Sequence, residues 1–135
     1  MSLMYMVQFK YNNDALIAII DQQQDRKAAA EALCESVGGK LHGMWGAIGQ
    51  DYHMFGIVEA PTEVAYMSAF MKLMKSGAFE SLKTIKLYST AQVAEAASMV
   101  AGIEYSFQMT TDAWARLSDS TTIQYLRLQN QRQAA

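Results

Sequence analysis

The sequence predicts an α+β fold in which strands and helices follow the order βαββαβ around one antiparallel sheet. The chain has 135 residues and 15.0 kDa, which fits one domain with a core of its own. Runs of β-forming residues alternate with runs of helical apolar spacing. Glycines, asparagines and a single proline separate these runs.

The first half of the chain predicts one strand and two helices. Residues 4–11, MYMVQFKY, are rich in β-forming residues and predict the first strand. Asp14, in the polar run that follows, is the expected cap of a helix. Residues 14–37 carry apolar positions at helical spacing on both sides of the run QQQDR, which predicts a short helix and then a longer one. Gly38 and Gly39 end the second helix.

The next elements complete the expected order. Residues 40–48 and 52–59 predict two strands joined by a short loop that contains glycine, so these strands are antiparallel neighbours. Pro61 and Thr62 are expected to open a helix that runs through Ser76, and residues 82–89 predict a fourth strand. A further helix is expected over residues 90–100, capped by its first residue, Thr90. This order is the ferredoxin-like arrangement, in which helices cover one face of the sheet and leave the other face open.

The remaining residues predict a C-terminal extension. We divide the chain into a domain over residues 4–100 and an extension over residues 101–135, which is expected to be partly helical and to pack on its own or a partner subunit. Alternating apolar residues over 103–109 suit either an added strand or an extended arm over a partner. Asp112 is an expected helix cap, and a last helix is expected from Thr121 or Thr122.

Composition and charge exclude several classes of function. A net charge of −2 and a pI near 5.6 leave no excess of basic residues to follow phosphates, so we expect no nucleic-acid partner. No apolar run approaches the length of a membrane span, and no signal peptide is visible, so we expect no membrane partner and a cytoplasmic location. Cys34 is alone and is expected to be a buried thiol.

The alternation of side chains along each strand predicts two unlike faces of the sheet. We expect the more apolar set to pack under the helices: Tyr5, Val7, Phe9, Leu41, Trp45, Phe55, Ile57, Ile85 and Leu87. We expect the opposite set on the open face: Met6, Gln8, Lys10, His42, Met44, Ile48, Met54, Val58, Thr84, Lys86 and Tyr88. Such a mixed face, in a chain with ten methionines, would suit an interface with a partly polar cavity.

Two segments carry a resemblance to a known family. The run GGKLHGMWGAIG, followed by YHMFGIVEAP, a helix rich in Ala and Met, and the strand end KLYST, resembles the GYD domain family from residue 4 to about residue 100. Members typically show glycine, any residue, tyrosine and aspartate before the apolar strand. Here Tyr52 falls on the tyrosine and His53 on the aspartate. The resemblance implies a dimeric α+β barrel, in which two open sheet faces pack across a two-fold axis.

The candidate site residues lie on the predicted open face and in the hairpin. Gln8, His42, Met44, Lys86 and Tyr88 are candidate ligand-binding residues, because they combine polar groups with adaptable apolar ones on the predicted open face. His42 and then His53 are the candidate catalytic bases, since a neutral imidazole can take a proton near neutral pH. Each also has a simpler interpretation: His42 as a hydrogen-bonded interface residue, and His53 as a solvated loop residue.

Other chemistry-bearing residues have structural interpretations. Glu59 is expected to support the start of the following helix rather than to act as an acid. No histidine, cysteine or glycine spacing typical of a metal site or a phosphate loop is present, so no metal and no cofactor are expected.

Three functions follow as hypotheses. The first is a small-molecule-binding α+β barrel that forms a dimer or a higher homo-oligomer. The second is a cofactor-independent enzyme of the isomerase or monooxygenase type that acts on a small carbonyl or aromatic compound, an analogy at the level of the fold alone. The third is a structural module whose role is oligomerisation.

Overall fold

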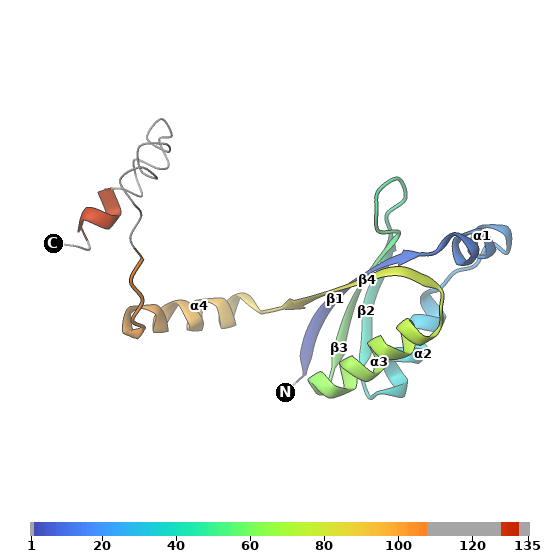
Figure 1. The fold of residues 1–135 in the computed structure, drawn as a ribbon. Helices are drawn as coiled ribbons and strands as arrows, with labels where there is room; N and C mark the ends of the chain where they lie inside the picture. Colours follow the sequence, from blue (N-terminus) through green and yellow to red (C-terminus); the bar gives the residue numbers. More distant parts are fainter. Residues whose placement is uncertain (1, 108–127, 133–135) are drawn as a thin grey trace. The chain divides into compact units, whose positions relative to one another are not determined.

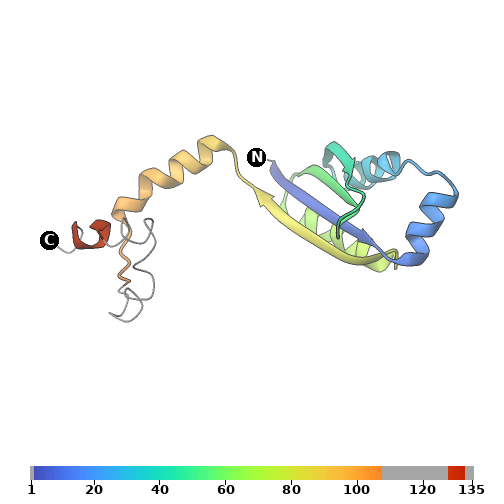
Figure 2. The ribbon, with the colours of Figure 1, turned by 90° about the horizontal axis from the view of Figure 1, so that it is seen from above.

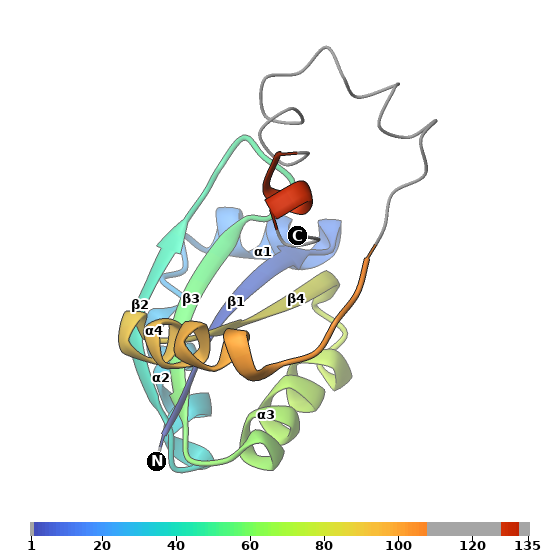
Figure 3. The same ribbon diagram turned by 90° about the vertical axis from the view of Figure 1, so that its left-hand side faces the viewer.

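The computed structural model describes residues 2–107 and 128–132. The chain divides into two compact units, Met1–Val93 and Ala94–Ala135. The first unit holds a four-stranded antiparallel sheet in the order β2-β3-β1-β4, which Figure 3 shows face on. This is the strand order of the ferredoxin-like fold, and the predicted α+β class is confirmed.

The elements of the first unit follow the expected order along the chain (Figure 1). The helices are α1 (Asn13–Asp21), α2 (Lys27–Ser36) and α3 (Glu63–Lys75). The strands are β1 (Leu3–Tyr11), β2 (Lys40–Gly46), β3 (Met54–Ala60) and β4 (Phe79–Leu87). β4 begins three residues before its expected start, because a register shift at Lys10 and Tyr11 lets Phe79 pair with Tyr11.

Helix α4 (Thr90–Met99) continues the chain after β4 and is followed by the short 3-10 helix η1 (Val100–Gly102). Residues 103–107 form neither helix nor strand, so the added strand expected from their alternation is not formed there. Residues 128–132 are helical, although the run after Leu128, QNQRQAA, was expected to fray. Met109, the Asp112 cap and the start of the last helix near Thr121 lie outside the described residues.

The helix caps differ from two expectations. Asn12, not Asp14, caps α1, and its side-chain oxygen accepts the Ala15 N–H at 2.9 Å. Ser89, not Thr90, precedes α4: its hydroxyl accepts the Gln92 N–H at 3.0 Å, while the Gln92 side chain accepts the Ser89 N–H at 2.8 Å. This reciprocal pair is a capping box, which needs a glutamine three residues after the cap.

The hydrophobic core centres on β1, one of the two central strands of the sheet. Tyr5, Val7, Phe9 and Tyr11 are each no more than 8% exposed, and they alternate along the strand. Helices α2 and α3 lie over the same face of the sheet (Figure 2). Tyr66 of α3 stacks on Tyr5, with ring centroids 3.8 Å apart.

The two faces of the sheet are not divided as the sequence suggested. Thr84 bonds to Tyr66 of α3 and Lys86 pairs with Glu63 of α3, so the expected open-face side chains of β4 lie on the helix side. Val58 and Met44 line the space under the helices as well. By alternation, the large apolar side chains of β3 and β4 that we expected under the helices lie on the open face: Phe55, Ile57, Ile85 and Leu87.

A bulge in β2 explains the remaining differences. Leu41 faces Val58 and Gly43 faces Ile57, so His42 is the extra residue between them. The bulge reverses the alternation that follows, which places Met44 under the helices. Trp45, paired with Phe55 and lying over Gly43, joins the open face instead of the core.

The expectations for β1 are confirmed. Tyr5, Val7 and Phe9 lie under the helices, and Met6, Gln8 and Lys10 lie on the opposite face. Two residues of the expected open face belong to no strand, since Ile48 lies in the β2–β3 loop and Tyr88 follows β4. Met54 shares the face of Gly56 and Val58, not that of Phe55. The open face is therefore more apolar than the sequence suggested.

Candidate functional site

The five candidate ligand-binding residues do not converge on one site. Gln8 lies on the open face, where its amide contacts only the Met6 sulfur, 3.7 Å away, among the described residues. Met44 and Lys86 lie on the helix-covered face, and Tyr88 follows β4 with 62% of its surface exposed. His42 lies in the bulge of β2, the edge strand.

His42 is paired with a carboxylate. Its Nε2 lies 3.2 Å from Oε1 of Glu59 on the neighbouring strand, and about a third of each side chain is exposed. A carboxylate in this position favours the tautomer with a proton on Nε2 and leaves the Nδ1 lone pair available. Glu59 thus orients an imidazole, a contact that the sequence did not predict.

Met44 lines a small apolar cavity between the sheet and helices α2 and α3. The cavity holds about 50 Å³ and its wall includes Cys34, Tyr66 and Phe70. Burial, and then the charge of Glu35, raises the pKa of the Cys34 thiol, which keeps it protonated and unreactive at neutral pH. A space of this size suits a gap in packing, not a bound metabolite.

Lys86 is held against α3. Its ammonium lies 3.1 Å from Oε1 of Glu63 and 5.7 Å from the centre of the Tyr88 ring. The hydrogen bond that Lys86 donates to Glu63 is the main cause that raises the pKa of Lys86. The cation is therefore already matched by an acid and an aromatic ring.

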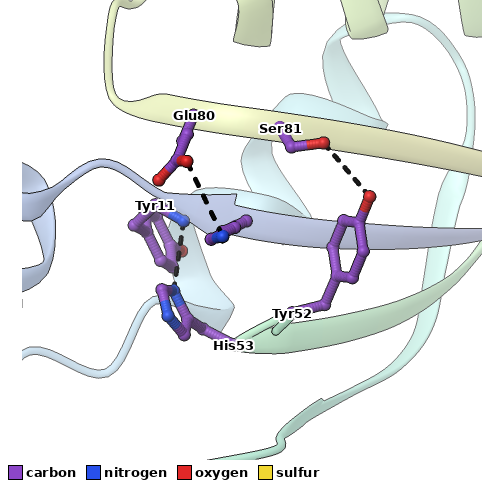
Figure 4. Close-up of polar contacts among 6 residues, drawn as sticks. Tyr11, Tyr52, His53, Glu80 and Ser81 are labelled. Atoms are coloured by element: carbon purple, nitrogen blue, oxygen red, sulfur yellow. Dashed lines mark hydrogen bonds and ion pairs between the residues drawn. The ribbon is translucent and has the colours of Figure 1, made fainter. Parts of the chain in front are cut away.

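His53 occupies a defined position at the start of β3. Its Nδ1 accepts the backbone N–H of Tyr11 at 3.2 Å, and its ring lies parallel to the Tyr11 ring with centroids 6.2 Å apart. The backbone N–H of His53 donates to the backbone carbonyl of Phe9 at 2.8 Å. Figure 4 shows His53 and Tyr52 diverging, with Tyr52 directed to Ser81, 3.1 Å away. The solvated loop histidine of the simpler interpretation is instead half-buried and bonded.

A groove lies beside His53. Helix α1 and the β2–β3 connection stand beyond the same end of the sheet (Figure 1), and they enclose a space of about 500 Å³. Apolar side chains form most of its lining, and a polar segment of the loop completes it: Tyr11, Leu16, Ile19, Ile20, Ile48, Gly49, Gln50, Asp51, His53 and Met54. A volume of this size is typical of small-molecule sites.

Most residues of the groove were not among the predicted site residues. Only His53 was a candidate, because α1 and the hairpin are far apart in the sequence. Ile48, in the hairpin loop, is 84% exposed, but a single exposed apolar side chain is common on protein surfaces and does not by itself indicate a groove.

The described residues hold no group of three His, Cys, Asp or Glu side chains arranged to bind a metal ion. Within residues 2–107 and 128–132, none of the helices has the length and hydropathy that crossing a lipid bilayer requires.

The GYD domain matches residues 5–97, which is more than half of the chain. The chain belongs to the GYD domain family. The matched range contains the sheet, α1 to α3, the His42–Glu59 pair and the whole groove of this GYD domain.

Solved structures match this GYD domain at low identity. One is a DABB family protein with a ferredoxin-like fold from Mesorhizobium loti, at 16% identity and a TM-score of 0.42, covering 65% of this chain and 96% of that one. Another is from Arabidopsis thaliana, at 13% and 0.41, covering 65% and 95%. A protein of unknown function from Nitrosomonas europaea matches at 15% and 0.37, covering 66% and 91%. No match was found among curated proteins.

Proposed function

We propose that the protein binds a small, largely apolar molecule in the groove between α1 and the β2–β3 hairpin. The observation that carries this proposal is a space of about 500 Å³ with a mostly apolar lining and one imidazole on its wall. Sites for small molecules are concave, mostly apolar and marked by a few fixed polar groups. We infer that His53, which falls on the aspartate of the GYD motif, is the residue that distinguishes this member.

The test uses a neutral fluorescent probe, N-phenyl-1-naphthylamine, and two tryptophan variants of α1. Ile20 lines the groove and Ile17 does not, although both are exposed, at 63% and 55%. Ile20→Trp should fill part of the groove and weaken probe binding at least tenfold, whereas Ile17→Trp should leave it within about twofold. Equal binding by both variants would remove the groove from consideration.

The open face of the sheet supports a second part of the proposal, that the protein is a homo-oligomer in which two such faces pair. Seven large apolar side chains from all four strands lie there with Gln8 and Lys10: Met4, Met6, Trp45, Phe55, Ile57, Ile85 and Leu87. A face of this kind exceeds what monomers usually leave wet, and a two-fold axis would cover it with its own copy. The C-terminal extension, residues 101–135, would pack on its own or the partner subunit.

A matched pair of variants tests the paired faces. Phe55→Glu would bury a charge in the interface and should dissociate the oligomer. Met67→Glu places the same charge on exposed α3, which lies on the other side of the sheet, and should leave the assembly intact. The proposal fails if sedimentation shows the same species for both variants.

The His42–Glu59 pair favours a second candidate function, a cofactor-independent enzyme that acts on a small carbonyl or aromatic compound. With Glu59 bonded to Nε2, the Nδ1 of His42 could take a proton as a general base. His53 is less suited to this role, because its Nδ1 already accepts the Tyr11 amide. Turnover of such compounds should fall at least a hundredfold in His42→Ala, and about tenfold in Glu59→Gln.

Activity that survives in the His42→Ala/His53→Ala double variant would contradict this second function. If probe binding and turnover both fail while the oligomer persists, the structural module becomes the better account.

A further inference from the structure

The geometry points to an uncharged ligand that carries a hydrogen-bond acceptor, such as a ketone, aldehyde or quinone oxygen. The Nε2–H of His53 donates a hydrogen bond to this oxygen. This inference rests on the proposed function, because it specifies the chemistry of the same groove. It assigns to His53 the role of a specificity-determining residue.

The hydrogen-bond pattern fixes the tautomer of His53. Nδ1 accepts a hydrogen bond from the backbone N–H of Tyr11, so this nitrogen carries no proton of its own. In the neutral ring the proton then lies on Nε2, on the side of the ring away from that amide. No described residue accepts a hydrogen bond from Nε2, which leaves a half-buried donor on the wall of the groove.

The donor is also held in place before any ligand arrives. The backbone of His53 bonds on both sides, to the Phe9 carbonyl and from the Ala47 N–H, each at 2.8 Å. Its ring lies parallel to that of Tyr11, at an angle of 4°. Because two hydrogen bonds hold the backbone of His53, and one hydrogen bond and a neighbouring aromatic ring hold its side chain, less side-chain entropy remains to be lost on binding.

The charges around the groove disfavour an anion. None of its described lining residues is a lysine or an arginine, and Asp51 supplies a carboxylate at its edge. Arg26 interacts with the Tyr11 hydroxyl and donates to the Gln24 side-chain oxygen at 3.1 Å, so this cation is already engaged. A carboxylate ligand would lose hydration in an apolar groove without gaining a counter-charge.

Three naphthalenes of nearly the same shape test this chemistry as competitors of N-phenyl-1-naphthylamine. 2-Acetylnaphthalene has the acceptor, 2-ethylnaphthalene lacks it, and 2-naphthoate carries a negative charge. We expect 2-acetylnaphthalene to bind about tenfold more tightly than 2-ethylnaphthalene, and 2-naphthoate to bind most weakly. Equal affinities for 2-acetylnaphthalene and 2-ethylnaphthalene would overturn the inference. If Ile20→Trp still weakens binding of the probe, the proposed groove remains intact.

His53→Phe should remove the preference for 2-acetylnaphthalene while leaving the affinity for 2-ethylnaphthalene within about threefold. His53→Gln, which can accept from the Tyr11 amide and still donate, should keep part of the preference. A preference that survives in His53→Phe contradicts the inference.

A measurement on the unaltered chain covers the case in which these variants do not fold. The imidazole ¹⁵N signals of His53 should show a proton on Nε2, and that nitrogen should shift with 2-acetylnaphthalene but not with 2-ethylnaphthalene. His42→Gln assigns the signals, since the chain has two histidines. A proton on Nδ1, or equal shifts with both compounds, would overturn the inference.

Discussion

The phenol of Tyr66 on α3 stacks on the ring of Tyr5 on β1, with centroids 3.8 Å apart and planes inclined by 15°. The same phenol shares a hydrogen bond of 2.6 Å with the Thr84 hydroxyl on β4. One side chain thus joins α3 to two neighbouring strands, β1 and β4. It belongs to the layer that covers the helix side of the sheet, whereas the large apolar side chains that point the other way lie on the open face.

Truncation of Tyr66 separates its two contributions. Tyr66→Ala should lower the free energy of unfolding by about 3 kcal/mol, near the low end for a large aromatic because the side chain is only half-buried. Tyr66→Phe keeps the stack and should cost about 1 kcal/mol or less. Urea denaturation measures both. Thr84→Val is the control, and the loss in the double variant with Tyr66→Phe should be less than additive.

The free energy of unfolding should fall at alkaline pH because of two phenols, those of Tyr11 and Tyr66. Burial is the main cause that raises the pKa of both Tyr11 and Tyr66. The neutral form is favoured in the folded chain, so this stabilisation is complete below about pH 10, where unfolded tyrosine titrates, and is lost as the pH rises through the folded values. The melting temperature should decline less steeply above pH 9.5 in Tyr66→Phe. An unchanged slope in both Tyr66→Phe and Tyr11→Phe would contradict this assignment.

The turn from α2 into β2 should tolerate no side chain at Gly39. A Cβ there would meet the backbone carbonyl oxygen of Glu59 and approach that of Cys34, and neither can move without disturbing the sheet. Gly39→Ala should therefore lower the free energy of unfolding by about 2–3 kcal/mol. Gly46→Ala is the matched control on the same strand, since its Cβ would come no nearer than 3.9 Å to its neighbours, and it should change stability by less than about 0.5 kcal/mol. Similar losses in the two variants would show that the crowding is absent.

The order of elements was predictable because each depends on local signals. Thr62 caps α3 as its position before the helix suggests, and its hydroxyl accepts the Ala65 N–H at 3.0 Å. Gly38, which ends α2, has a φ of 77°, a conformation that favours glycine. Alternation along β1 also gave its two faces correctly, because that strand has no bulge before Lys10.

The faces of the other strands could not be predicted from hydrophobicity alone. On β3 the helix side takes Gly56 and Ala60, small residues that let helices approach, whereas Phe55 and Ile57 lie outside. Assigning the larger side chains to the core assumes that only one face is to be covered. An apolar outer face, such as one that pairs with a second copy, breaks that assumption.

The groove depends on contacts that no local pattern encodes. Ile20 of α1 and Ile48 of the hairpin line the same space, although they are 28 positions apart in the sequence, with α2 and β2 between them. The role of His53 likewise depends on the amide of Tyr11, on a neighbouring strand. The sequence supplied the imidazole, and the fold supplies its partner.

Sedimentation equilibrium of the unaltered chain tests the account most directly, because the open apolar face is its central feature. At micromolar concentration we predict a species of at least twice the chain's 15.0 kDa, since pairing removes that face from water. A stable 15.0 kDa monomer under the same conditions would contradict the account.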